Sequence, residues 1–111
     1  MIKTKSIFED RSLEDGTRIC VMRYARGSYD YDEWLQRLAP FSTLLANYKN
    51  LFTCTWDKFK NLYLKQMEQQ VGLIKSLKTR SDNGEVITLL CWEKDDRYCH
   101  RSLLKTLIEE S

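Results

Sequence analysis

One continuous apolar run constrains the fold of this chain more than any other feature. After the turn-forming pair Asn83-Gly84, residues 86–91 read Val-Ile-Thr-Leu-Leu-Cys, a run of strand length. A strand that is apolar on both sides needs cover on both faces of its sheet. The run therefore predicts a central strand of a parallel sheet.

Two further strands are predicted nearer the amino terminus. Residues 17–24 are rich in β-branched and apolar side chains and lead into a turn, whereas residues 2–8 alternate less regularly. The polar segment 9–16 between them is expected to be a loop. Strands separated by helical stretches indicate an α/β fold, since parallel neighbours require crossover connections. We expect one α/β domain over residues 1–111, with a small, mainly parallel sheet of three to four strands and flanking helices.

Two short helices are predicted in the middle of the chain. Asp30 stands three residues before Glu33, which is the spacing of a capping box, and apolar residues then recur at helical intervals up to Pro40. Ser42 is the predicted cap of the second short helix. We therefore expect two short helices before the longest helix of the chain.

Two longer helices follow. Apolar residues at steps of three and four predict one helix over residues 56–77, bent or split near Gly72. A terminal helix is predicted from the apolar positions in residues 103–108, with Asp95 or Asp96 as its cap. These helices supply the layers that cover the sheet.

Charge and composition exclude some classes of protein. The chain has 18 Lys and Arg against 16 Asp and Glu, a net charge of +2, which argues against a protein that coats nucleic acid. It has no apolar run long enough for a signal peptide or a membrane span, so we expect a cytoplasmic protein with no membrane partner. In that compartment its four cysteines should be reduced. No cofactor is predicted, and the oligomeric state stays open.

The carboxyl ends of parallel strands predict where a ligand would bind. In open α/β sheets ligands bind beyond these ends, and basic residues follow both buried strands. The basic residues expected to bind the ligand are Arg23, Arg26, Lys94 and Arg101, with Arg97 nearby. The leading hypothesis is a cleft for a small anion, such as a phosphate or a nucleotide-like ligand. Surface ion pairs with neighbouring acids are the alternative for these charges.

The last motif also carries groups that can react. Cys99 is predicted at the amino end of the terminal helix, where the helix dipole and nearby cations lower a thiol's pKa. His100 is the chain's one histidine and can act as a general acid or base, with Glu93 orienting or transferring protons. Cys91 is assigned a structural place at the strand end. Cys99 can equally be a small buried side chain, so whether the chain is an enzyme stays open.

Three other functions use the same segment. A phosphate loop of the cysteine-phosphatase kind needs glycines, and the residues between Cys91 and Arg97 include none. A metal could be held by Cys91, Cys99 and His100 with an acid such as Glu93, although adjacent residues on a helix are awkward chelators. The leading assignment therefore includes no metal. The last alternative is a non-catalytic module whose exposed aromatic residues meet a protein partner; these residues are Tyr29, Tyr31 and Trp92.

The motifs resemble a known family. The segments "TLLCWEKDDRYCHRSLL", "VMRYARGSYDYDEWLQRLAP" and "TWDKFKNLYLKQM" are similar to the pattern of the domain-of-unknown-function family 488. The resemblance implies a small α/β domain with a parallel sheet and implies no activity. The positions that it carries over are Arg23, Arg26, Cys91, Glu93, Lys94, Cys99, His100 and Arg101. This chain departs from the pattern at Met22, where related sequences often have an acid.

Overall fold

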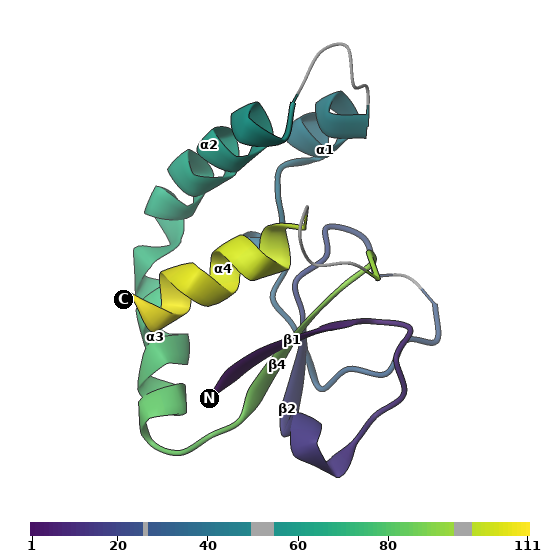
Figure 1. Ribbon diagram of the computed structural model, residues 1–111, viewed down its shortest axis with the longest axis vertical. Coiled ribbons are helices and arrows are strands. Elements are labelled where there is room, and N and C mark those ends of the chain that lie inside the picture. The colour runs from purple at the N-terminus through teal and green to yellow at the C-terminus, as the bar shows by residue number, and fades with distance from the viewer. Residues whose placement is uncertain (26, 50–54, 95–98) are drawn as a thin grey trace.

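The sheet has four strands that all run parallel. The computed structural model describes residues 1–25, 27–49, 55–94 and 99–111 (Figure 1). The strands are β1 (Ile2–Ser6), β2 (Thr17–Cys20), β3 (Glu33–Trp34) and β4 (Ile87–Cys91). Their order across the sheet is β1-β4-β2-β3, and each neighbouring pair is parallel. The predicted α/β class is confirmed.

Strand β4 lies in the middle of the sheet because its side chains can be buried on both faces of the sheet. All five of its residues are buried. It pairs with β1 on one side and with β2 on the other, so that Leu89 stands between Thr4 and Ile19. The prediction of a central strand at this run is confirmed.

Within the described residues, four α-helices and three short 3₁₀ segments complete the fold. The α-helices are α1 (Ser42–Lys49), α2 (Trp56–Met67), α3 (Val71–Asp82) and α4 (His100–Glu109). The 3₁₀ segments are η1 (Leu13–Asp15), η2 (Gln36–Leu38) and η3 (Glu68–Gln70). The predicted long helix is split at η3, just before Gly72, as the weak helix propensity of glycine indicated. Helix α1 begins at Ser42, the predicted cap.

The helices pack on one face of the sheet and build the main core. Helix α4 lies against β1 and β4 and also contacts α2 and α3 (Figure 1). Side chains that alternate along the strands, such as Ile19 and Val21 of the β2 segment, join this core. The core is completed by helix residues that include Phe59, Tyr63 and Leu77. The edge at which the strands end therefore lies beside the amino end of α4.

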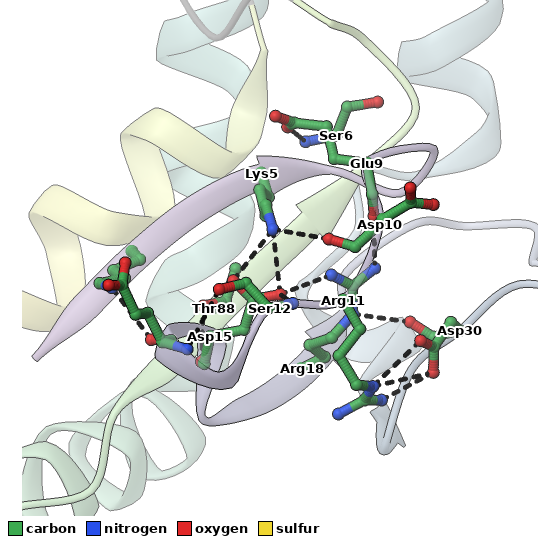
Figure 2. Close-up of polar contacts among 12 residues, drawn as sticks. Lys5, Ser6, Glu9, Asp10, Arg11, Ser12, Asp15, Arg18, Asp30 and Thr88 are labelled. Carbon is green, nitrogen blue, oxygen red and sulfur yellow. Dashed lines mark hydrogen bonds and ion pairs between the residues drawn. The ribbon is translucent and has the colours of Figure 1, made fainter.

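The opposite face of the sheet carries a buried polar network. Arg18 of β2 is fully buried, and its guanidinium donates to the Asp15 carboxylate at 2.7 Å (Figure 2). Thr88 of β4 donates to the Asp15 carbonyl, and Lys5 of β1 contacts the same carboxylate. Arg11 binds Asp30 and Asp32 from the neighbouring loop. These contacts fasten the loops of residues 7–16 and 29–32 to the sheet.

Two predicted helix starts are wrong. The capping-box pair Asp30 and Glu33 does not start a helix, because Glu33–Trp34 instead pairs with β2 as an edge strand and only η2 follows. The Asp30 carboxylate accepts from Arg11 rather than from a helix terminus. The N-cap of α4 is Cys99, so neither acid predicted as its cap holds that position.

Strand β2 is shorter than predicted, and some of the residues singled out in the sequence lie outside the described ranges. The predicted strand over residues 17–24 ends at Cys20, although the Val21 amide still donates to Leu90 of β4. Arg26, Asp95, Asp96 and Arg97 lie outside the described residues. Within the described ranges, no helix is long and apolar enough to span a bilayer.

Candidate functional site

A pocket opens at the carboxyl edge of the sheet. It encloses about 720 Å³, within the range of small-molecule sites. Its lining comes from the segments after β2 and β4, from helices α1 and α2, and from the start of α4. The lining residues are Met22, Arg23, Tyr24, Tyr29, Leu45, Tyr48, Phe59, Cys91, Trp92, Glu93, Cys99 and His100. The predicted convergence of the segments after β2 and β4 is therefore observed.

Four polar side chains meet at one end of this pocket. The Sγ atoms of Cys91 and Cys99 lie 3.3 and 3.2 Å from Oε2 of Glu93. The same sulfur atoms lie 3.6 and 4.0 Å from Nδ1 of His100. The possible ligand atoms of Cys91, Cys99 and His100 all lie within 4.8 Å of one another. We call these four residues the Cys-Glu-His cluster.

The histidine ring is held in one orientation. Its Nε2 lies 2.7 Å from the Val21 carbonyl, which can only accept a hydrogen bond, so Nε2 carries the proton. Nδ1 therefore presents its lone pair to the two sulfur atoms. The ring of Tyr63 packs edge-on against the imidazole at 5.4 Å, and the Tyr63 hydroxyl donates to the Leu38 carbonyl. His100 is thus a rigid acceptor aimed into the cluster.

Cys99 joins His100 because the two residues differ in backbone conformation. Cys99 is the N-cap of α4 and is extended, with φ −126° and ψ 141°, whereas His100 is the first helical residue. On a regular helix, adjacent side chains point about 100° apart. The change of backbone conformation removes this constraint. The objection that adjacent residues chelate poorly from a helix therefore does not apply here.

The close contacts change the acidity of the three acids in the cluster. A hydrogen bond from the Cys91 thiol lowers the pKa of Cys99 to about 6, while the same bond and burial raise the pKa of Cys91. Burial alone would raise the pKa of Glu93, but hydrogen bonds from the two thiols outweigh it and lower that pKa. At neutral pH the cluster therefore holds a carboxylate and one thiolate side by side.

Arg101 supports the cluster from inside the protein. The side chain is 2% exposed, and its guanidinium donates to the carbonyls of Glu93 and Lys94 and to Sγ of Cys99. These bonds fix the segment that follows β4 and so hold the Glu93 side chain near the sulfur atoms. Arg101 was predicted as a ligand-binding cation, and its contacts are those of a positioning residue.

The other predicted cations contribute less to the pocket. Arg23 lines it, but its guanidinium donates to the carbonyls of Pro40 and Ala39 at 3.0 and 2.9 Å. Lys94 is exposed and does not line the pocket. Arg26 lies outside the described residues. Of the four predicted cations, Arg23 and Arg101 thus donate to main-chain carbonyls.

Some site residues had no signal in the sequence. Tyr48 and Phe59 were part of apolar patterns that predict core, and Phe59 does lie in the core while also bordering the pocket. The carbonyl of Val21, which fixes the His100 ring, belongs to a segment predicted only as strand. Tyr63 was likewise one member of an apolar stripe. Only the three-dimensional packing brings these residues to the cluster.

Comparison with known proteins gives one match. The model of the family DUF488-N3a, described as the active DUF488-N3 subclade, matches residues 2–111. No curated protein and no solved structure matches the chain.

Proposed function

The chain belongs to the DUF488-N3a family, and from that premise we propose that it is a metal-binding protein whose Cys-Glu-His cluster holds a zinc ion. The ligands are the sulfur atoms of Cys91 and Cys99, Nδ1 of His100 and a carboxylate oxygen of Glu93. Zinc fits this donor set because it prefers thiolate and imidazole ligands and accepts carboxylate.

The observation that carries the proposal is the spacing of the four groups. Tetrahedral zinc, with bonds of about 2.3 Å to sulfur and about 2.0 Å to nitrogen or oxygen, requires its ligand atoms to stand about 3.5 to 3.8 Å apart. The four distances between sulfur and the nitrogen or oxygen atoms run from 3.2 to 4.0 Å. The ligand atoms of Cys91, Cys99 and His100 lie within 4.8 Å of one another, and the Glu93 carboxylate approaches the two sulfur atoms.

The charge and hydrogen-bonding capacity of the cluster support the same conclusion. Nδ1 of His100 and the Glu93 carboxylate can only accept hydrogen bonds, and thiols are weak donors. Cys91, Cys99 and His100 are each at most 4% exposed, whereas Glu93 is exposed to solvent. A cation held between the two sulfur atoms, the imidazole and the carboxylate would replace the weak hydrogen bonds that the thiols donate to Glu93.

The surroundings of His100 are those of a metal ligand. Histidines that bind metals usually donate their other ring N–H to a carbonyl or a carboxylate, which fixes the tautomer. Nε2 of His100 does so toward the Val21 carbonyl. A zinc ion with four protein ligands has no open coordination position, which is the arrangement of structural zinc sites. The donor set therefore favours a zinc ion that fixes the segment after β4 to the start of α4.

Metal content of the purified protein tests this proposal. We expect about one zinc per chain, and cobalt substitution should give the intense visible absorption of a tetrahedral site with thiolate ligands. Cys91→Ser, Cys99→Ser and His100→Gln should each lower the zinc content sharply. Cys20→Ser is the matched control, since Cys20 is also a buried free cysteine but lies outside the cluster.

Two results would contradict the metal assignment. One is a folded wild-type protein that takes up no zinc or cobalt when either is supplied in excess. The other is a Cys99→Ser variant that folds, as judged by circular dichroism, and still binds zinc as tightly as the Cys20→Ser control.

A cysteine nucleophile is the second candidate function. The low pKa of Cys99 favours it, with His100 and Glu93 as the proton-transferring groups. Rapid and selective alkylation of Cys99 in a protein that binds no metal would support this candidate against the zinc site. Anion binding has less support, because Arg23 and Arg101 donate to main-chain carbonyls. A titration with inorganic phosphate followed by NMR tests it.

A further inference from the structure

We propose that the pocket binds a small molecule with a planar aromatic or heteroaromatic ring, which lies against Trp92 and presents one edge to the Cys-Glu-His cluster. The inference names the substrate class for the site. It depends on the proposed function in one respect only, since the edge of the ring would face the proposed zinc ion. The ring-binding wall itself is argued from the pocket.

Aromatic side chains form one wall of the pocket. Trp92 and Tyr29 line it, and Phe8 contacts both of them. The ring centroid of Phe8 lies 4.7 Å from that of Trp92 at an interplanar angle of 76°, and 6.0 Å from that of Tyr29 at 75°. Edge-to-face contacts of this kind favour one orientation of the rings. The orientation of Trp92 is therefore supported by Phe8.

This wall stays open to solvent. Trp92 is 53% exposed, Phe8 is 49% exposed and Tyr24, another lining residue, is 64% exposed. Large apolar side chains that gather in an exposed group usually mark a binding site. Helices α1 and α2 contribute Tyr48 and Phe59 to the same lining. The pocket thus has aromatic groups from three separate parts of the chain.

The lining favours a planar ring over a compact anion or a flexible chain. Aromatic faces stack on planar π-systems at little conformational cost, since few side-chain torsions must be fixed. Arg23, the cation that lines the pocket, is bonded to Pro40 and Ala39. The polar groups of the cluster contact one another and line the same pocket. A ring with a polar edge can stack on the aromatic side chains and present that edge to these groups.

The wall and the cluster are also linked by the chain. Trp92 lies between Cys91 and Glu93, so a ring that stacks on Trp92 contacts the residue that joins two members of the cluster. The Trp92 carbonyl accepts from the hydroxyl of Ser6 at 3.4 Å, which ties this position to β1. A ligand on Trp92 therefore occupies the pocket that the Cys-Glu-His cluster also lines.

NMR titration of the zinc-loaded, full-length protein tests the inference. The indole N–H signals of Trp34, Trp56 and Trp92 are separately observable once assigned, and the signal of Trp92 should shift with saturation. The probes are benzimidazole, nicotinamide and adenosine at low millimolar concentration. Ribose and cyclohexanol are the controls without an aromatic ring, and neither should shift that signal.

Substitutions at the wall sharpen the test. Trp92→Ala should weaken binding of the best probe by at least about fivefold, which is the lower end for loss of one stacking partner. Trp92→Phe keeps an aromatic face and should restore most of the affinity. Leu62→Ala changes an exposed apolar residue of α2 that does not line the pocket and should change nothing.

The outcomes separate this inference from the zinc proposal. If zinc binds but no ring probe shifts the Trp92 signal, the ring inference is wrong and the metal site stands. If the probes bind equally well to protein that never takes up zinc, the metal proposal fails and the ring-binding pocket stands. Equal affinity of ribose and adenosine would also overturn the inference.

Discussion

Removal of one buried charge should destabilise the protein by a predictable amount. The Asp15 carboxylate is 6% exposed and accepts from Arg18 at 2.7 Å, from Lys5 at 3.0 Å and from the Ser12 amide at 3.0 Å (Figure 2). Asp15→Asn preserves the shape of the side chain but removes the negative charge. The guanidinium of Arg18, which is fully buried, then has no carboxylate partner at this position.

The size of the effect follows from the pKa of Asp15. Burial alone would raise this pKa, but the hydrogen bonds from Ser12, Arg18 and Lys5 outweigh it and lower the pKa from 3.8 to about 2. A difference of this size corresponds to about 2 kcal/mol of stability at neutral pH. Breaking a buried ion pair typically costs 3–5 kcal/mol. We therefore expect Asp15→Asn to lower the free energy of unfolding by about 2 to 4 kcal/mol at pH 7.

The effect should depend on pH in one direction. Because the folded-state pKa is lowered, the ionised Asp15 contributes stability above about pH 4, and this contribution is lost as the pH falls toward 2. At pH 3 roughly half of this contribution of about 2 kcal/mol should have disappeared. The difference between wild type and variant should therefore be smaller at pH 3 by about 1 kcal/mol.

Urea unfolding followed by circular dichroism at both pH values measures this difference. Asp10→Asn is the control, since it makes the same chemical change at an exposed position of the same loop. A cost below about 0.5 kcal/mol at pH 7, which is typical of a surface position, would refute the argument. An equal cost at pH 7 and pH 3 would refute its electrostatic part.

Three further predictions concern the site and its support. Zinc should slow alkylation of Cys99 by iodoacetamide at least about tenfold, as a metal-bound thiolate is protected, while labelling of Cys20, followed by peptide mass spectrometry, should not change. Arg101→Lys should weaken zinc affinity by roughly 10- to 100-fold, the range for groups that orient ligands, and competition with a chelator measures it; unchanged affinity would remove its positioning role. Tyr63→Phe should cost about 1 kcal/mol in urea unfolding, because the buried Leu38 carbonyl loses its donor; a stabilised variant would contradict this.

The sequence was a reliable guide wherever one local pattern decides the structure. The run that forms β4 is buried at five consecutive positions, of which only Thr88 is polar, and no amphipathic helix or exposed strand would bury all of them. Thr55 is a good N-cap residue and does accept from the Lys58 amide at the start of α2. Such signals require only neighbours in the chain.

The sequence was a poor guide where distant residues decide the structure. The spacing of Asp30 and Glu33 matches a capping box and so predicts a helix start. Instead, Glu33 and Trp34 pair with β2 as the edge strand of the sheet, and Arg80 of α3 binds Glu33 at 2.7 Å. Arg11 engages Asp30 from a segment 19 residues away in the chain. Tertiary contacts therefore overrode the local capping signal.

The site was predictable in its members but not in its geometry. The sequence shows that four reactive residues lie close together in the chain: Cys91, Glu93, Cys99 and His100. In a parallel sheet, the segment that holds them is expected near the carboxyl end of β2. The extended conformation of Cys99, which allows it to approach the His100 ring, is a property of the helix start that no spacing rule supplied. The Val21 carbonyl that selects the tautomer lies 79 residues away.

X-ray absorption spectroscopy of the zinc-loaded wild-type protein tests the central claim most directly, because it counts the sulfur atoms around the metal. Ligation by Cys91, Cys99, His100 and Glu93 predicts two sulfur atoms at about 2.3 Å and two lighter atoms at about 2.0 Å from zinc. Cys99→Ser should lower the sulfur count to one. Zinc bound by nitrogen and oxygen alone, or a sulfur count that Cys99→Ser leaves unchanged, would contradict the assignment.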